Sequence, residues 1–454
     1  MITEERAFAG RLALAGGATA TLVSASLLSA LLGYTQKLAC SSGGAWNNFV
    51  GQFRADCYTD IYPLYYSEGL SSGKVPYLDH PVEYPVLIGW TMEAAAWVVS
   101  GVGDIYARGQ DFYYVTVAIL AICLVAGVLA TGYLAGPRLR WSALMVALSP
   151  ALIFAAFINW DMLAMALAAC GMAAWAARRP VLAGVLISLA VSTKFYPLLI
   201  FAALFLVCLR AGRLRDFARC FGAGLAAWLI INLPVAIVAP AGWARFYAFS
   251  RDRGADWGSV WYLFEHYNVP FLATTSLDSL NVLSSAAFAV CALLIALLTL
   301  TAPRRPRLPQ VAFLLLAAFL ISNKVWSPQY VIWLVPLAVL ARPRWWPYVL
   351  WQAAELAYFF GIWGYFVGMY AAPAGITAGW YFVTLAARLI TVALVGLFVI
   401  LDILHPEQDV VRQSGADDPA GGVLDGAPDR FRLTGFRLAS PVGAPAGDRR
   451  VGGA

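Results

Sequence analysis

Hydrophobic residues recur along this chain in long runs that are separated by short polar segments. A run of about 20 apolar residues can cross a hydrocarbon core about 30 Å thick as a helix. The pattern therefore predicts an all-α polytopic membrane protein. About twelve spans are predicted, at residues 12–34, 112–135, 141–157, 161–177, 181–193, 195–210, 217–240, 279–301, 311–323, 330–341, 346–367 and 378–402. The first run lacks a small-residue cleavage site and is typical of a signal anchor.

Basic residues mark one side of these spans. Five inter-span loops hold clusters of arginine, at residues 138–140, 178–179, 210–219, 304–307 and 342–344. Loops between them carry mixed or acidic charge, so the positive-inside rule places the arginine clusters and both termini in the cytoplasm. If the segment 84–102 crossed the membrane alone, every later arginine cluster would lie outside, against the positive-inside rule. This segment also contains the charged residue Glu93. We therefore expect an interfacial or re-entrant helix there, inside a first external loop of about 35–111.

Composition agrees with a membrane protein. The 454 residues are 61% hydrophobic and only 12% charged, whereas soluble proteins are about 25% charged. The net charge of +6 lies in short clusters between apolar runs, which is topology information and argues against a nucleic-acid partner. Residues 1–403 are predicted to form the membrane bundle, with a second external loop at 241–278. Residues 404–454 are rich in Gly, Pro, Asp and Arg, and we expect a disordered cytoplasmic tail.

Polar residues gather on the predicted external side. Two short spans end at Lys194 and Lys324, and each lysine is soon followed by a proline. Helices that end this early favour a water-filled cavity in the outer leaflet, because bare backbone is tolerated at that depth only there. A snorkelling lysine is the structural alternative. The functional alternative is a pair of cations that converge on a phosphate, joined by an arginine of 245–253, with Arg251 as the candidate.

The stretch "CYTDIYPLYYSEGLSSGKVPY" at 57–77 holds several carboxylates and tyrosines. Asp60 precedes a short helix, so it is either the N-cap of that helix or a general base that faces the cavity. Glu83 lies between two prolines and either binds a substrate hydroxyl or favours the helix dipole. Asp161 is either a helix cap or a further membrane-edge charge with a function. Tyr62 and its neighbours are candidates for a wall against sugar or lipid.

Other chemistry finds little support. No His, Cys and Asp cluster has metal-ligand spacing, although an Asp/Glu pair for a divalent ion stays open. The chain has no Walker A or HExxH motif, so we expect no nucleotide-driven step, no metal site and no cofactor. Cys40 and Cys57 share the first external loop, and an oxidising environment would allow a disulfide between them.

Several motifs along the chain resemble glycosyltransferase family 87. They are "YTDIYPLY", "GKVPY", "VEYPVLIG", "NWDMLAMALA", "STKFYPLLI" and "SNKVWSPQYVIWLVPL", and they occur over about 400 residues. The resemblance implies a GT-C fold, whose long first loop carries juxtamembrane helices, and a mannosyltransferase that uses a polyprenyl-phosphate sugar. It also implies that an aspartate of the first loop is the catalytic base. Asp60 is the matching position, and Asp56 is the nearby rival.

One departure from the family concerns the late external loop. Some relatives place a histidine there, near the donor phosphate, but "KVWSPQY" has none. That role then falls to Lys324 or Gln329, or is absent. The candidates for binding the sugar or acceptor are Glu83, Tyr62, Asp161 and Gln329.

The expected function is transfer of a sugar, mannose first among the candidates, from a polyprenyl-phosphate donor to a hydroxyl of a glycolipid or cell-envelope glycan. The expected place is the outer face of the plasma membrane, with inversion at the anomeric carbon and Asp60 as base. The alternative is a transporter or flippase of lipid-linked sugars. Transporters favour paired broken helices in two related halves, whereas here the polar residues concentrate on one side.

Overall fold

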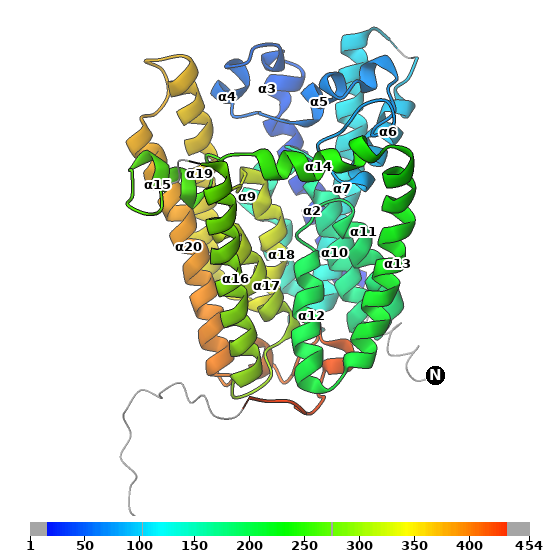
Figure 1. The fold of residues 1–454 in the computed structure, drawn as a ribbon, viewed down its shortest axis with the longest axis vertical. Coiled ribbons are helices and arrows are strands. Elements are labelled where there is room, and N and C mark those ends of the chain that lie inside the picture. Colours follow the sequence, from blue (N-terminus) through cyan, green and yellow to red (C-terminus); the bar gives the residue numbers. More distant parts are fainter. Residues whose placement is uncertain (1–15, 102, 274–275, 434–454) are drawn as a thin grey trace, which may run out of the picture.

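The computed structural model describes residues 16–101, 103–273 and 276–433, and this part of the chain is helical without a β-strand. Twelve helices or helix pairs run roughly parallel to one another and form a bundle (Figure 1). Their bounds are α2 Gly16–Gln36, α7 Ile105–Leu134, α8 Ala143–Ala147 with α9 Pro150–Ala155, α10 Asp161–Ala176, α11 Pro180–Val191, α12 Leu198–Ala211, α13 Leu214–Val238, α16 Leu277–Thr301, α17 Leu308–Ser322, α18 Val331–Ala341, α19 Trp345–Tyr370 and α20 Ala378–Leu404.

Five of these helices are long and apolar enough to cross a membrane by length and composition: α2, α7, α13, α16 and α20. Several others are apolar but have fewer than 18 residues. The structure thus supports a membrane protein, while the count of about twelve spans stays a prediction. Residues 12–15 of the first predicted span lie outside the described residues.

The predicted span 141–157 is a broken element. It divides into α8 and α9, because Pro150 starts a new helix whose N-cap is Ser149. The Ser149 hydroxyl accepts a hydrogen bond from the Leu152 amide and donates one to Gln352 of α19 at 2.7 Å. The side-chain amide of Gln352 thereby ties the break to the bundle, which satisfies polar groups that would otherwise be buried unpaired.

Small residues let some helices pack closely. A Cβ atom added at Gly184 of α11 would lie 1.9 Å from the carbonyl oxygen of Cys220 in α13. Close backbone approach at small residues is typical of helix pairs in membranes. We expect substitution at Gly184 to push α11 and α13 apart.

One end of the bundle carries the long loops, and we call it the loop end. Its first loop holds α3 Leu38–Ser41, α4 Gly51–Arg54, α5 Ile61–Ser67 and α6 Val86–Val98, and its second holds α14 Pro240–Asp252 and α15 Val260–His266. Helix α14 lies across the bundle beneath the first loop (Figure 1). Helix α6 has 13 residues, about 20 Å at 1.5 Å per residue, and the expectation of a non-crossing helix at 84–102 stays a prediction.

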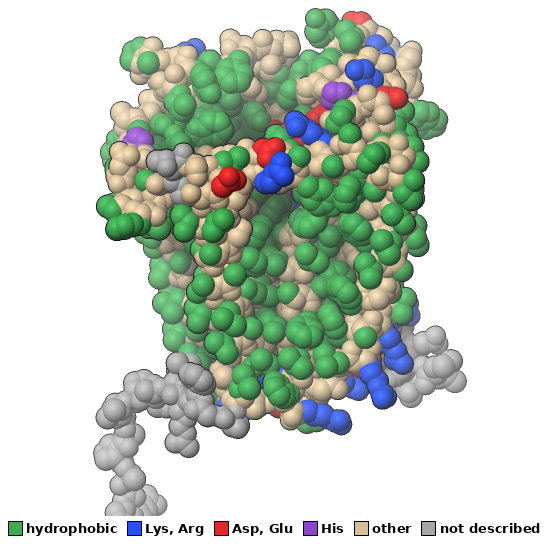
Figure 2. All heavy atoms as spheres, viewed as in Figure 1, with side chains coloured by type: hydrophobic (Ala, Val, Ile, Leu, Met, Phe, Trp, Pro, Cys, Tyr) green, Lys and Arg blue, Asp and Glu red, His purple; other side chains and the backbone are tan. Residues whose placement is uncertain are grey.

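The opposite end holds the predicted cytoplasmic arginine clusters, and we call it the arginine end. In Figure 2 the visible face is hydrophobic at mid-height, and charged side chains gather towards the two ends. This pattern is expected of a bundle whose middle lies in hydrocarbon.

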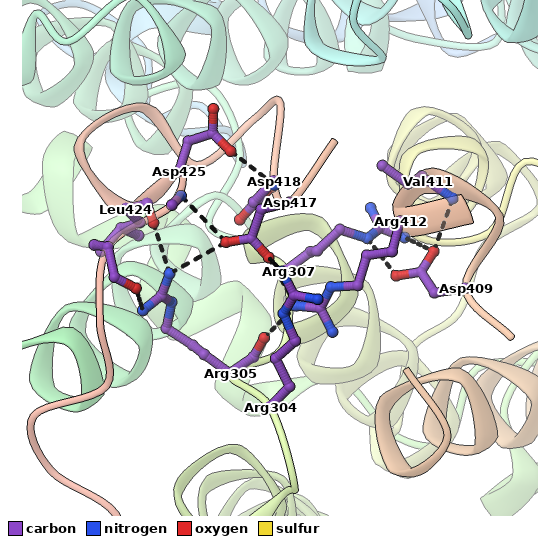
Figure 3. A network of polar contacts seen from close by, with 12 residues as sticks. Arg304, Arg305, Arg307, Asp409, Val411, Arg412, Asp417, Asp418, Leu424 and Asp425 are labelled. Atoms are coloured by element: carbon purple, nitrogen blue, oxygen red, sulfur yellow. Dashed lines mark hydrogen bonds and ion pairs between the residues drawn. The ribbon is translucent and has the colours of Figure 1, made fainter. Parts of the chain in front are cut away.

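The chain after α20 differs from the expected disordered tail. Residues 405–433 fold back across the arginine end and include α21 Val410–Gln413. Asp409 pairs with Arg307 at 2.7 Å, and both side chains are buried. Asp417 pairs with Arg304 and Arg412, and Asp429 pairs with Arg210 (Figure 3 shows the part around Arg307). These carboxylates thus pair with arginines, of which Arg210 and Arg307 are buried. Residues 434–454 of the expected tail lie outside the described residues.

Candidate active site

A cavity of about 760 Å³ opens at the loop end, between the two long loops and the ends of the helices below them. Polar side chains line one part of it. They are Tyr58, Asp60, Glu83, Asn159, Lys194, Arg253, Asp256, Asn323, Lys324, Ser327, Gln329 and Tyr330. Aromatic side chains line the rest, among them Phe49, Phe53, Phe246, Phe249, Trp257, Trp363, Phe366 and Tyr370. The cavity therefore offers both a charged site and an apolar wall, which is typical of ligand-binding cavities.

Asp60 lies directly before α5, yet its side chain makes no capping hydrogen bond to that helix. Its carboxylate instead lines the cavity and accepts a hydrogen bond from the Tyr58 hydroxyl. Burial raises the pKa of the Asp60 carboxyl to about 6, against the lowering effects of the Tyr58 hydrogen bond and the Lys194 ammonium. Of the two interpretations of Asp60, this geometry favours a cavity-facing base over a helix cap.

Asp56, the rival of Asp60, does not line the cavity. Its backbone carbonyl accepts a hydrogen bond from Gln36, and its residue lies at a positive φ of 53°.

Lys194 lines the cavity where α11 has ended. Its ammonium is 3.0 Å from the Asp161 carboxylate and lies over the Tyr84 ring, 4.5 Å from the ring centroid. Asp161 is fully buried and does not line the cavity. Asp161 is therefore the buried counter-ion of Lys194, and Lys194 is the residue of the pair that lines the cavity.

Lys324 also lines the cavity, but its three ammonium donors already have partners. It donates to the backbone carbonyls of Arg251 and Arg253, at 2.7 and 2.6 Å, and to the side chain of Asn281 at 2.5 Å. The lysine thus clamps the loop that follows α14. The Lys324 ammonium is therefore occupied by oxygen atoms of this loop. The same loop carries a second cationic side chain that lines the cavity.

That cation is Arg253. Its guanidinium lines the cavity and lies 3.2 Å from the buried Asp256 carboxylate. The predicted candidate Arg251 lies elsewhere: its side chain is 73% exposed and pairs with Asp252 at 2.9 Å. Helix α14 ends at Asp252, so Arg251 lies within the helix. Arg253 is the first residue after it, has an extended backbone and lines the cavity. The sequence indicated the segment 245–253 but not which of its arginines lines the cavity.

The remaining candidates separate into two groups. Glu83 and Gln329 line the cavity, whereas Tyr62 is buried away from it and stacks on Trp46 at 4.7 Å. Burial raises the pKa of the Glu83 carboxyl, and the nearby Arg253 and Lys194 lower it. The tyrosines of the first loop that do line the cavity are Tyr58 and Tyr84.

Two further expectations concern cysteines and metals. The structure joins Cys40 and Cys57 in a disulfide, with their Cα atoms 5.8 Å apart. Among the described residues, no group of three or more His, Cys, Asp or Glu side chains is arranged to hold a metal ion.

A search of curated proteins found no match to the chain. A protein-family comparison did: residues 107–328, just under half of the chain, match the model of glycosyltransferase family 87. The matched segment includes Lys194, Arg253 and Lys324 but not Asp60. This family consists of glycosyltransferases, which act on a sugar donor and an acceptor. Residues 107–328 are therefore similar to the family that the motifs of the chain predicted, glycosyltransferase family 87.

Proposed function

We propose that this protein is a membrane glycosyltransferase of GT-C type that moves a sugar from a polyprenyl-phosphate donor to a hydroxyl of a glycolipid or cell-envelope glycan. Mannose is the proposed sugar, and the outer face of the plasma membrane is the proposed place. The observation that carries the proposal is one cavity that is lined by Asp60, a carboxylate whose pKa is raised by burial, by the cations Lys194 and Arg253, and by aromatic side chains.

The two cations suit a phosphate that leaves. A glycosyl phosphate develops negative charge on the phosphate oxygen as the bond to the anomeric carbon breaks, and fixed cations in a site of low dielectric stabilise that charge. Lys194 is held by Asp161 and Arg253 by Asp256, so neither has to be ordered when the donor binds. Arg253 takes the role that was expected of Arg251, and Lys324 holds the loop on which Arg253 lies.

Asp60 suits proton removal from the acceptor. A carboxylate with a pKa of about 6 is ionised at neutral pH and is a stronger base than an ordinary aspartate. The acceptor oxygen attacks the anomeric carbon from the face opposite the phosphate, and its proton passes to Asp60. The carbon–oxygen bond to the phosphate breaks, and its electron pair leaves with the phosphate. A single displacement of this kind inverts the configuration, and no step is assigned to a metal ion or cofactor.

The aromatic wall and Gln329 suit the rest of the two substrates. Aromatic faces stack on sugars and on lipid chains, and Glu83 and Gln329 offer hydrogen bonds to sugar hydroxyls from the polar part of the cavity.

The proposal is tested with purified protein in lipid nanodiscs and a set of radiolabelled polyprenyl-phosphate sugars that includes mannose, arabinose and glucose. With a membrane glycolipid extract as acceptor, we expect the label of one donor, mannose, to move to the acceptor with release of polyprenyl phosphate. If no donor is cleaved, and the protein in sealed vesicles instead moves intact polyprenyl-phosphate sugar between leaflets, the flippase alternative replaces this one.

A further inference from the structure

The segment that carries Asp60 is held at every residue from 56 to 60. Three side chains donate to consecutive carbonyl oxygens of this segment, and Thr59 and Asp60 donate to the loop between α9 and α10. The pairs are Gln36 to Asp56, Trp46 to Cys57, Lys37 to Tyr58, Thr59 to Phe157 and the Asp60 amide to Ile158. The Cys40–Cys57 disulfide adds a covalent tie at the same place. This dense anchoring fixes the backbone on both sides of Tyr58.

Lys37 gives one of these ties. Its side chain is fully buried, and its amine donates to the Tyr58 carbonyl at 2.8 Å. Burial lowers the pKa of Lys37 to about 7, and because both the charged and the neutral amine carry N–H groups, the Tyr58 carbonyl keeps this donor in either form.

The Tyr58 ring is fixed as well as its backbone. It packs against Phe53 and Trp363, with ring centroids 5.8 and 4.8 Å apart. From this position the hydroxyl donates to Oδ1 of Asp60. No described residue donates a hydrogen bond to Oδ2 of Asp60, and the side chain lines the cavity. The two carboxylate oxygens therefore have different surroundings: one is bound to Tyr58, and the other is free for a ligand.

We propose that Tyr58 is a positioning residue for Asp60, which occupies Oδ1 and leaves Oδ2 to accept the proton of the acceptor hydroxyl. This inference rests on the proposed function. In the transfer step the acceptor oxygen–hydrogen bond breaks and a bond from hydrogen to Oδ2 forms. The new bond from the acceptor oxygen to the anomeric carbon forms as the carbon–oxygen bond to the phosphate breaks, with its electrons leaving on the phosphate. Tyr58 keeps its own proton throughout.

Several charged and titratable groups face Asp60 from the elements around it. They are Lys37 after α2, Tyr58 on its own segment, Glu83 and Tyr84 before α6, Asp161 of α10 and Lys194 after α11. The Tyr58 hydrogen bond lowers the pKa of Asp60, because it stabilises the ionised carboxylate. Removing only the hydroxyl should therefore raise the pKa of Asp60 and leave the other groups unchanged.

The test variant is Tyr58→Phe, which keeps the ring against Phe53 and Trp363. We expect kcat for transfer from a polyprenyl-phosphate sugar to fall about tenfold, because the Asp60 carboxylate loses the contact that holds it in position for the acceptor hydroxyl. The KM for the donor should stay within about twofold, and the acidic limb of kcat/KM should move to higher pH. Tyr66→Phe is the matched control. Its hydroxyl lies in the same loop and bonds to Tyr62 and to the Ile105 carbonyl, so its pH profile should equal that of the wild type.

A second measurement does not need activity. Infrared spectra of the protonated carboxyl band, titrated with pH and corrected by subtraction of an Asp60→Asn sample, give the midpoint of Asp60. We expect a higher midpoint in Tyr58→Phe than in the wild type, and equal midpoints would overturn the inference. So would a Tyr58→Phe enzyme with the wild-type kcat and acidic limb. A wild-type protein that transfers no sugar from any donor would instead overturn the proposed function itself.

Discussion

At the scale of single residues, Asp60 is the group on which the proposed chemistry depends. A base must be ionised to accept a proton, and burial raises the pKa of Asp60 to about 6. We therefore predict that kcat/KM rises with pH and levels off above about pH 6, because the protonated carboxyl below that pH accepts no proton. A profile of initial rates across this range checks the prediction. A rate that stays constant from about pH 5 to about pH 8 would speak against a carboxylate base of this kind.

Two arginines in the same segment give a second test. Arg253 lines the cavity and Arg251 is exposed. We predict that Arg253→Gln raises the KM for the donor about 10- to 100-fold, as expected for loss of a charge-assisted hydrogen bond. Arg251→Gln is the matched control and should change it less than about twofold, since an exposed ion pair contributes little. Steady-state kinetics with varied donor decide the matter, and equal effects of the two substitutions would refute the placement of Arg253.

The candidate site could be predicted only in part from the sequence. Five residues that were predicted for the site line one cavity: Asp60, Glu83, Lys194, Lys324 and Gln329. They could be predicted because a charged or polar side chain at the edge of a membrane costs free energy and is therefore usually kept for a function. The sequence could not show that Arg253 rather than Arg251 lines the cavity, because this depends on the residue at which α14 ends.

The contacts of Lys324 and Tyr58 could not be predicted from the sequence. Both side chains are held by residues far away in the chain: Lys324 donates a hydrogen bond to Asn281, and the Tyr58 ring packs against Trp363. No local pattern encodes such pairings.

At the scale of elements, residues 405–433 form a strap over the arginine end. Asp409 neutralises Arg307, and Arg307 also donates to the carbonyls of Leu340 and Ala341 at the end of α18. The sequence predicted disorder here because Gly, Pro and Asp suggest it. The composition gave no sign that arginines between the spans would bind those aspartates.

The strap leads to a stability prediction. Asp409→Asn leaves the buried Arg307 without its counter-charge, which we expect to cost about 3–5 kcal/mol. The matched control is Asp252→Asn, which breaks the exposed pair with Arg251 and should cost less than about 1 kcal/mol. Thermal unfolding of both variants in detergent, followed by size-exclusion chromatography, measures the difference. If Asp409→Asn unfolds at the wild-type temperature, the strap does not stabilise the bundle.

At the scale of the whole molecule, the two ends have different characters. The loop end carries the cavity and the Cys40–Cys57 disulfide, and the arginine end carries the buried ion pairs of the strap. A disulfide is favoured on the oxidising side of a membrane and arginine clusters on the cytoplasmic side, so both features favour the proposed orientation, with the loop end outside.

This orientation predicts a labelling pattern. In a variant that lacks the five unpaired cysteines, Asp252→Cys at the loop end should react with a membrane-impermeant maleimide on intact cells. Glu407→Cys at the arginine end should react only after the membrane is opened. Both native side chains are more than half exposed, so access to the reagent decides the result. The reverse pattern would place the cavity in the cytoplasm.

The central claim is that the cavity transfers a sugar from a polyprenyl phosphate with Asp60 as base. It is tested most directly by transfer of radiolabelled sugar from that donor by purified wild-type protein and by Asp60→Asn, which keeps the size of the side chain. The account predicts that Asp60→Asn folds and binds the donor as the wild type does, but that its transfer rate falls by about 10²- to 10⁴-fold, the usual contribution of general-base catalysis. Transfer by Asp60→Asn at the wild-type rate would contradict it.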